Sequence, residues 1–265
     1  MILPPQFQHF PPPHLPPPME RDTMATRTLS RITKVLLAPA LALGATIGLA
    51  SAPASAAVWN SCDQWGNTSL NGYTLYNNIW GSGGGSQCIW ANSGTNWGVW
   101  ANHPNTGGIK SYPNAKKVVN RSITSMSSLN SSYNVTVPSS GAYNTSYDVW
   151  DTDYDYEIML WVNYNGDVGA LGSYQGNVTL GGHNWNVYKG RVTRADGTYW
   201  DVFSFLRTSD STSGTVQILP VLKWIKDTKG WMGNETIGDV QFGFEITSSS
   251  GGLDFRTNSM SISSS

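Results

Sequence analysis

The chain has 265 residues, and its first 56 hold ten of the fourteen prolines but none of the twelve Trp or twelve Tyr. The remaining 209 residues suit one domain with a sizeable core, and they carry 12 Lys and Arg against 15 Asp and Glu, a formal charge of −3. This charge excludes the basic surface of a nucleic-acid-binding protein, and the many aromatic and β-branched residues exclude a disordered chain. Twenty-four Trp and Tyr exceed what such a core needs, so some rings are expected to face something other than the interior.

Residues 24–56 have the pattern of a secretory signal peptide. The apolar run is too short for a comfortable membrane span, and no second hydrophobic stretch follows it. We therefore expect a secreted, extracellular protein that does not associate with a membrane after cleavage. The positive, apolar and small-residue parts of the signal follow in the usual order: Arg27, Arg31 and Lys34, then residues 35–49, then Ala54-Ser55-Ala56.

Residues 1–23 form a proline-rich extension with two Pro-Pro-Pro runs. Such runs are typical of a polyproline II recognition segment. The preferred interpretation is a translation start assigned too early, with Met24 as the true beginning. Residues 57–265 are then the exported domain.

The two cysteines, Cys62 and Cys88, both lie in the exported part and are 26 residues apart. One loop-closing disulfide in an oxidising compartment fits this pattern, and two buried free thiols are the alternative. With only two further histidines in the exported part, a zinc site is not expected. No metal ion and no cofactor is predicted.

Strand patterns dominate the exported part. Short β-branched and aromatic runs are separated by Gly- and Asn-rich turns, which predicts an antiparallel sandwich or barrel. The expected strands, in chain order, begin at Val135, Tyr147, Glu157, Asn177, Trp185, Tyr199 and Val240.

The window Gln217–Lys229 breaks the strand pattern. Its apolar residues recur at helical spacing, Gly230 follows as a stop, and Pro220 is tolerable in the first turn of a helix. We expect an all-β fold with one helix packed on its outside, in which Trp224 is a packing residue.

Few side chains outside the carboxylates offer chemistry. His103 precedes a proline and His183 lies in a Gly-Gly turn, so both are interpreted as surface turn residues rather than members of a catalytic triad. Asp151, Asp153 and Asp155 alternate, as calcium ligands can. No Gly or Glu follows them at the required spacing, so a solvated hairpin is expected.

The exported part contains only three glutamates. Glu235 lies in a polar loop and is expected at the surface. Glu157 and Glu245 lie inside apolar strands, where the two-residue period places Glu157 with Met159 and Trp161, and Glu245 with Gln241, opposite aliphatic or aromatic faces that fit a core. The two faces that carry glutamate are therefore expected to line a cleft.

A pair of carboxylates across a cleft walled by aromatic rings is what glycosidic hydrolysis requires. Sugar rings stack their C–H faces on Trp and Tyr, and their hydroxyls bond to Asn, Gln and Ser. Composition alone does not separate such an enzyme from a lectin-like sugar-binding module.

At these residues the chain resembles glycoside hydrolase family 12, the compact jelly-roll endoglucanases. The resemblance covers residues 62–263, and each of its motifs is weak alone, whereas seven in family order are specific. They are Ser61-Cys-Asp-Gln-Trp, Tyr73-Thr-Leu-Tyr-Asn-Asn-Ile-Trp-Gly, Lys110-Ser-Tyr-Pro-Asn, Tyr147-Asp-Val-Trp, Glu157-Ile-Met-Leu-Trp, Gly172-Ser-Tyr-Gln-Gly and Phe242-Gly-Phe-Glu.

The resemblance implies a β-jelly-roll sandwich of two curved antiparallel sheets with an open concave cleft. It makes Glu157 the nucleophile, Glu245 the acid/base and Asp148 the residue that modulates the nucleophile, and it pairs Cys62 with Cys88. Ala170 departs from an expected proline, in a loop that resembles the cord beside the cleft, and the segment from Asp148 to Glu157 is shorter than in the family. The implied substrate contacts are Trp65, Asn78, Trp80, Tyr112, Met159 and Trp161.

The sequence thus predicts a monomeric, secreted endo-β-1,4-glucanase that acts on cellulose and β-glucan by a retaining double displacement. Two alternatives stay open: a xyloglucan-specific endo-β-1,4-glucanase of the same family, and a non-catalytic glucan-binding module. We also expect apolar neighbours and the charge of Glu157 to raise the pKa of Glu245.

Overall fold

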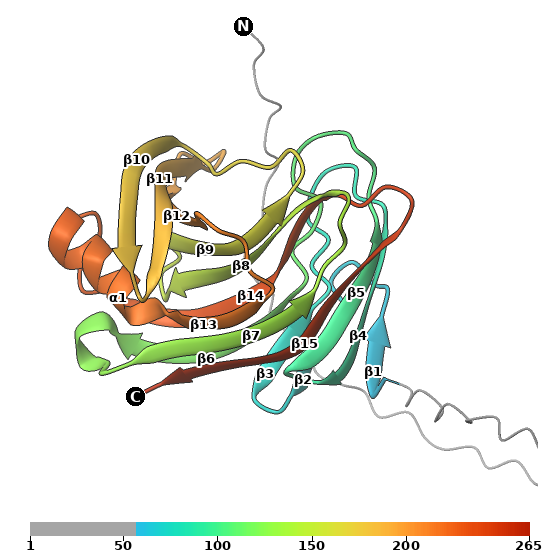
Figure 1. The fold of residues 1–265 in the computed structure, drawn as a ribbon, viewed down its shortest axis with the longest axis horizontal. Helices are drawn as coiled ribbons and strands as arrows, with labels where there is room; N and C mark the ends of the chain where they lie inside the picture. The colour runs from blue at the N-terminus through green and yellow to red at the C-terminus, as the bar shows by residue number, and fades with distance from the viewer. Residues whose placement is uncertain (1–56) are drawn as a thin grey trace, which may run out of the picture. The chain divides into compact units, whose positions relative to one another are not determined.

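Two β-sheets form the layers of the fold (Figure 1). The computed structural model describes residues 57–265; the extension at 1–23 and the signal peptide at 24–56 lie outside the described residues. The six-stranded sheet has the order β1 (Trp59–Ser61), β4 (Ser86–Ser93), β5 (Asn96–Asn102), β15 (Leu253–Ser264), β7 (Leu129–Thr136) and β13 (Ser213–Gln217).

The nine-stranded sheet carries the predicted catalytic strands. Its central strand β8 lies between β9 and β14, so Glu157 and Glu245 stand on the two neighbours of one strand. The order is β10 (Ser173–Leu180), β11 (His183–Thr193), β12 (Tyr199–Arg207), β9 (Tyr156–Asn165), β8 (Ala142–Asp151), β14 (Thr236–Ser248), β6 (Asn114–Ser122), β3 (Tyr73–Tyr76) and β2 (Asn67–Leu70).

The prediction of antiparallel sheets is wrong at one pair, because β12 runs parallel to β9. The chain leaves β9 for the sheet edge at β10 and returns through two antiparallel steps, β10 to β11 and β11 to β12. These two strands supply the long connection that a parallel pair needs. The other pairs between named strands are antiparallel, as expected.

The core lies between the sheets and follows the two-residue period of the strands. Phe242, Phe244, Ile158 and Leu160 are fully buried, as predicted. Burial of each such side chain contributes roughly 1.5–3 kcal/mol relative to leaving it exposed. The opposite faces of the same strands therefore stay outside this core and carry the glutamates.

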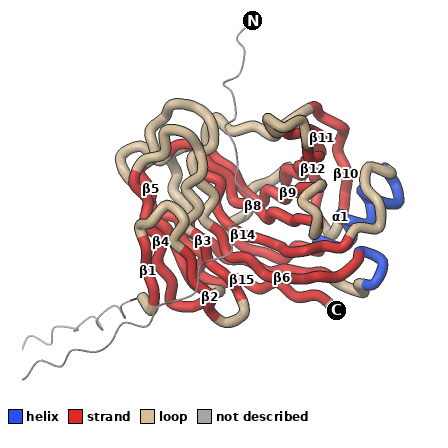
Figure 2. Tube along the Cα trace, turned by 180° about the vertical axis from the view of Figure 1, so that it is seen from behind, coloured by secondary structure: helices blue, strands red, loops and turns tan. Residues whose placement is uncertain are grey.

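The helix predicted for Gln217–Lys229 is confirmed, and its hydrogen-bonding geometry changes part-way along. An α-helix, α1 (Ile218–Lys223), continues as a π-helical turn, η2 (Trp224–Lys229), and Gly230 ends it with a left-handed φ of 62°. The Trp224 ring packs on Phe205 at 5.8 Å. Figure 2 shows that strands and loops make up most of the described residues, and a 3₁₀ turn, η1 (Ile123–Ser125), is the other helical segment there. No helix in residues 57–265 is long and apolar enough to cross a membrane.

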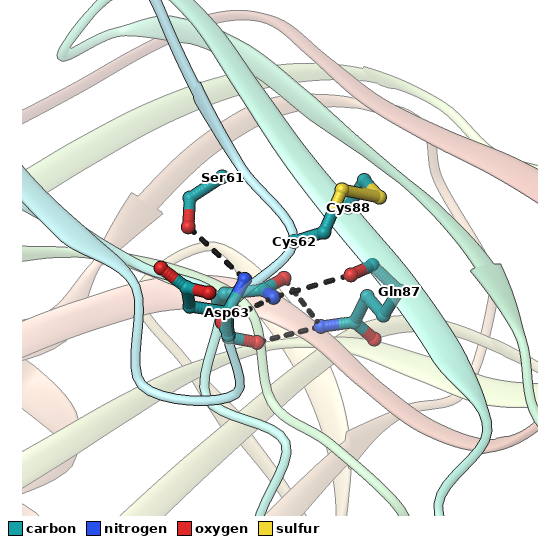
Figure 3. The surroundings of a disulfide bond; sticks show 6 residues. Ser61, Cys62, Asp63, Gln87 and Cys88 are labelled. Carbon is teal, nitrogen blue, oxygen red and sulfur yellow. Dashed lines mark hydrogen bonds between the residues drawn. A yellow bond between two sulfur atoms is a disulfide. The ribbon is translucent and has the colours of Figure 1, made fainter.

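Cys62 and Cys88 form the expected disulfide (Figure 3). It connects the segment after β1 to β4. Beside it, the buried amide of Gln87 is held by Asn77, whose carbonyl accepts from Gln87 Nε2 at 2.6 Å. The disulfide thus anchors the loop that leads to Asn78.

The prediction for His103 is wrong, because its side chain is buried. The backbone N–H of Gly85 donates to Nδ1 at 2.8 Å, so the proton lies on Nε2, which donates to Gln87 Oε1 at 2.8 Å. Burial, and then the nearby charge of Lys110, lowers the pKa of His103 to about 4. Because both ring nitrogens have partners, the neutral imidazole is tolerated in the interior. His183, by contrast, lies partly exposed at the β10–β11 turn, as predicted.

The aspartate hairpin between β8 and β9 is built on Asp151. Its Oδ1 accepts the backbone N–H groups of Asp155 and Tyr156, both at 2.9 Å, and its Oδ2 accepts that of Asp153 at 3.2 Å. Asp153 and Asp155 are exposed, as expected, whereas Asp151 is buried. The turn is therefore organised by backbone donors to one carboxylate, which accounts for the short connection.

Candidate active site

The residues predicted for catalysis lie on one face of three adjacent strands. We call this surface the carboxylate face: it is the side of the nine-stranded sheet that carries Asp148, Glu157 and Glu245. Asp148 of β8 lies opposite Met159 of β9, and Glu245 of β14 lies opposite Asn144 of β8. Asp148 and Glu245 are 6% and 9% exposed, and Glu157 is partly exposed, so the carboxyls lie just beneath the surface.

Asp148 and Glu157 interact directly, and this interaction raises the pKa of Asp148 and lowers the pKa of Glu157. Burial, and then the charges of Glu157 and Glu245, raise the pKa of Asp148 well above its usual range. Burial also raises the pKa of Glu157, but hydrogen bonds from Trp200 and Asp148 oppose this. Asp148 is thus the protonated donor and Glu157 the ionised acceptor.

Trp200 holds the other side of the Glu157 carboxylate. Its indole Nε1–H donates to Glu157 Oε2 at 2.7 Å, across the parallel β12–β9 pair. The guanidinium of Arg194 lies over the Trp200 ring, 4.6 Å from its centroid. A charge-assisted bond of this kind stabilises the ionised carboxylate and fixes its orientation.

Glu245 has the opposite character. Asn144 Nδ2 donates to Glu245 Oε2 at 2.5 Å. Burial raises the pKa of Glu245 to about 7; the bond from Asn144 lowers it, and the charge of Glu157 raises it, as expected from the sequence. The group is therefore protonated up to near-neutral pH. Two glutamates on one face thus differ in protonation, which is the arrangement that suits one nucleophile and one acid.

An apolar cluster supports these groups from the β9 and β12 side. It consists of Met159, Trp161, Trp200, Val202 and Leu206. Met159 lies opposite Asp148, whereas the Trp161 ring is 3% exposed and packs on Tyr164 at 6.0 Å. Trp161 is on the predicted face but is buried in the cluster, and Ala170 of the cord-like loop packs against the same cluster.

Tyr112 connects the predicted sugar contacts to the carboxyls. Its hydroxyl donates to the Ser146 carbonyl at 3.2 Å, and its backbone N–H donates to the Asn78 carbonyl at 3.0 Å. Burial, and next the charge of Asp148, raises the pKa of Tyr112, with smaller contributions from Glu245 and Glu157. Tyr112 therefore lies within electrostatic reach of all three carboxyls.

Asn78, Trp80 and Trp65 lie together beside this tyrosine. Asn78 Nδ2 donates to the Tyr112 carbonyl at 3.1 Å, and Trp80 is partly exposed. The backbone of Gln64 accepts the Ile79 N–H at 3.1 Å, which brings the Trp65 loop alongside. Trp65 is 53% exposed, so its ring is open to a ligand. Glu235 is outside this group and accepts the Gly233 N–H in a loop.

Three residues that contact the carboxyls were not predicted from the sequence: Asn144, Trp150 and Trp200. The two-residue period from Asp148 reaches Ser146 and Asn144, so the pattern of β8 contains a signal for Asn144. Trp150 Nε1 donates to Asp148 Oδ2 at 3.3 Å and stands in the motif that carries Asp148. No local signal marks Trp200, because its contact with Glu157 depends on the parallel pairing. No group of three His, Cys, Asp or Glu within residues 57–265 could hold a metal ion.

Comparisons with known proteins place this geometry in one family. The sequence profile of glycosyl hydrolase family 12 matches residues 71–263. The chain belongs to this family. As a family 12 member it is a glycoside hydrolase of the endoglucanase type, and its two sheets with one helix form the family's jelly roll.

Curated relatives of this family 12 chain include Endoglucanase S of Pectobacterium parmentieri. The two sequences are 33% identical over 210 residues, and the alignment covers 69% of this chain and 79% of the relative. Among solved structures is the xyloglucanase domain of NopAA from Sinorhizobium fredii in complex with cellobiose, with 40% identity, a TM-score of 0.74, and coverage of 78% of this chain and 99% of that one. A family 12 xyloglucanase from Bacillus licheniformis has 27% identity and a TM-score of 0.71, covering 78% and 100%. The family 12 relatives thus include both endoglucanases and xyloglucanases.

The contact of Trp200 with Glu157 predicts a kinetic effect. Trp200→Phe keeps an aromatic ring but removes the donor, and a hydrogen bond to a charged group contributes about 1.5–3 kcal/mol. We expect kcat/KM to fall about 10- to 100-fold, and the acid-side pKa of the pH–rate profile to rise because ionised Glu157 loses a partner. Trp150→Phe, which removes only the 3.3 Å bond to Asp148, is the matched control and should change the profile less. An unchanged acid limb in Trp200→Phe would contradict this role.

The protonation of Glu245 predicts where kcat/KM falls on the basic side of its pH profile. Its raised pKa of about 7 keeps the acid protonated below that value, so kcat/KM should decline as the pH rises through about 7. Asn144→Ala removes the bond that favours the ionised form and should move this limb to higher pH. The check is kcat/KM between pH 4 and 9 in both proteins. A limb that stays in place in the variant would argue against Glu245 as the titrating group.

Proposed function

We propose that the chain is an endo-β-1,4-glucanase that hydrolyses internal β-1,4-glucosidic bonds of cellulose and mixed-linkage β-glucan with retention of configuration. The observation that carries this proposal is the placement of two glutamates on one face with different hydrogen-bond partners. Glu245 is protonated near neutral pH, whereas Glu157 accepts bonds from Trp200 and Asp148. Both retaining and inverting glycosidases need one carboxylic acid and one carboxylate, and the resemblance to family 12 makes this carboxylate the nucleophile of a retaining reaction.

The proposed reaction has two displacements at the anomeric carbon. A Glu157 oxygen attacks the anomeric carbon while the bond between this carbon and the leaving glycosidic oxygen breaks. Glu245 gives its proton to the leaving oxygen. Glu245, now ionised, takes a proton from water, and the water oxygen attacks the same carbon and releases Glu157. One water is consumed for each bond cleaved, Glu245 ends protonated again, and the scheme needs no cofactor.

Asp148 and Trp200 assist Glu157 in this scheme. While Glu157 is ionised, both donate to it; when it becomes a glycosyl ester its charge disappears, and the two bonds weaken. Asp148 can keep its proton throughout, because burial and the Glu245 charge raise its pKa. The pair thereby favours the carboxylate that must leave in the second step.

Substrate would be held along the surface that joins the carboxyls to the exposed Trp65. Tyr112 and Asn78 are joined by two hydrogen bonds, and Trp80 and Trp65 lie in the adjacent loops. We assign these four residues to sugar binding, with Met159 beneath the reacting ring. Because Trp161 is buried in the apolar cluster, its proposed contribution is to support this floor.

Secretion is part of the proposal. It is supported by the signal-peptide pattern at 24–56 and by the disulfide Cys62–Cys88, since disulfides persist in oxidising compartments. Family 12 enzymes are typically secreted, which agrees with this placement. The active species is proposed to be a monomer.

Xyloglucan is the second candidate substrate. It is favoured by the names of relatives: the Sinorhizobium fredii domain and the Bacillus licheniformis enzyme are both xyloglucanases. A product profile across amorphous cellulose, barley mixed-linkage glucan and tamarind xyloglucan separates the candidates. We expect the unbranched glucans to be cleaved at least as fast as xyloglucan; turnover of xyloglucan alone would make the chain a xyloglucan-specific glucanase. Absence of new reducing ends from all three would support a non-catalytic binding module instead.

The nucleophile assignment predicts the behaviour of Glu157→Gln. This isosteric change should lower kcat on the order of 10⁴-fold or more, because no covalent intermediate can form, and should preserve oligosaccharide binding. A variant that kept most of its activity would refute the assignment. Azide added to Glu157→Ala should give a glycosyl azide of inverted configuration, and the same treatment of Glu245→Ala should give the retained one. Analysis of the products by NMR therefore distinguishes the two glutamates.

A further inference from the structure

The outer face of the six-stranded sheet, turned away from the core, carries two tryptophans. In β4 and β5 the inward-facing residues alternate with an outward-facing set that includes Trp90, Gly98 and Trp100, of which Gly98 is itself buried. Trp90 lies directly opposite Gly98, which makes Trp100 its diagonal neighbour on the same face. Trp90 is partly exposed and Trp100 is 39% exposed. This pair is remote from the carboxylate face, which belongs to the other sheet.

Glycines let both rings lie against the backbone. A Cβ placed on Gly98 would meet Trp90 Cζ2 at 2.6 Å, and one placed on Gly252 would meet Trp100 Cζ2 at 2.8 Å. Each ring therefore covers a glycine that has no room for a side chain. A ring laid on the sheet in this way has its inner side packed, and Trp100, at 39% exposure, is the more open of the two rings to a ligand.

The surroundings of the two rings are polar and almost free of charge. The six strands of this sheet contain only two charged residues, Asp254 and Arg256, which have opposite sign. Asp254 lies opposite Trp100, and Arg256 lies opposite Gly98 with its guanidinium 5.9 Å from the centroid of the Trp90 ring. A net neutral face does not suit nucleic acid or an anionic membrane, both of which require a basic surface.

Amide side chains continue this face along β4, β5, β15 and β7. Asn92 donates to Asn96 at 2.8 Å, and Asn258 donates to Asn134 at 2.9 Å. Asn96 also donates to the Asn258 carbonyl at 2.8 Å, which joins the two pairs. Neutral amides beside aromatic rings are the groups that bind sugar hydroxyls and sugar C–H faces.

We propose that this face is a second binding surface for β-glucan, with Trp90 and Trp100 as the rings on which sugars stack. The occupant is the neutral polymer, because the face combines aromatic rings, amides and no net charge. The choice of β-glucan rests on the proposed function. A polymer bound here would keep the enzyme on its substrate between cleavage events while the carboxylate face stays free.

Native affinity electrophoresis in gels that contain barley mixed-linkage glucan tests this surface. The Glu157→Gln protein serves as background, so that the polymer stays intact during the run. Replacing both rings (Trp90→Ala and Trp100→Ala) should weaken retardation by about fivefold or more, as expected for the loss of aromatic anchors. Val58→Ala, which trims an exposed apolar side chain just before β1, is the control and should leave retardation unchanged. Unaltered retardation of the double variant would overturn the proposal.

Two further measurements keep the outcome interpretable. Thermal unfolding establishes that the variants fold. If the double variant does not fold, Trp100→Ala is tested alone, because the Trp100 ring is the more exposed of the two. This single variant must also weaken retardation. In the active background, cleavage of short cello-oligosaccharides should be unchanged by the substitutions and cleavage of amorphous cellulose should slow. Equal loss on both substrates would assign the rings to stability only. If the protein cleaved no glucan, the proposed function would fail, while the gel assay would still report on this surface.

Discussion

Strand β8 is hydrogen-bonded to β9 on one side and to β14 on the other, and the site depends on the register of these two pairings. Asp148 faces Met159 and lies diagonal to Glu157, whereas Asn144 faces Glu245. A shift of one residue in either pairing would turn a glutamate into the core and a core residue outward. The buried aromatic and aliphatic side chains on the inner face, Phe242 and Ile158 among them, fix that register by hydrophobic burial.

Three carboxyls beneath one surface would repel one another if all were ionised. Their hydrogen-bond partners differ: Trp200 and Asp148 donate to Glu157, Asn144 donates to Glu245, and Trp150 donates to Asp148. Burial raises the pKa of all three, so only the one with two donors is held ionised. The apolar cluster around Trp200 strengthens this difference, because electrostatic interactions weaken less in a water-poor environment.

The burial of two side chains, His103 and Trp161, differs from what the local sequence predicts. The proline after His103 predicts a surface turn, yet hydrogen bonds with Gly85 and Gln87 make the neutral ring acceptable in the interior. Trp161 lies on the carboxylate face, as its strand period predicts, but its ring is buried in the apolar cluster to which β12 contributes Trp200, Val202 and Leu206. For both residues the groups that decide burial are distant in the sequence, so the local pattern does not show them.

The sequence by itself determined the composition of the two faces of each strand, the single helix, and the glutamates that stand on polar faces. These follow from periods of two and 3.6 residues, which are local properties of the backbone. Only the tertiary structure decided which groups control protonation. Trp200 and Glu157 are 43 residues apart, and Asn144 and Glu245 are 101 apart. Contacts at such separation depend on strand order and on the parallel pairing of β12 with β9, which are set by the packing of the whole sheet and leave no local periodicity.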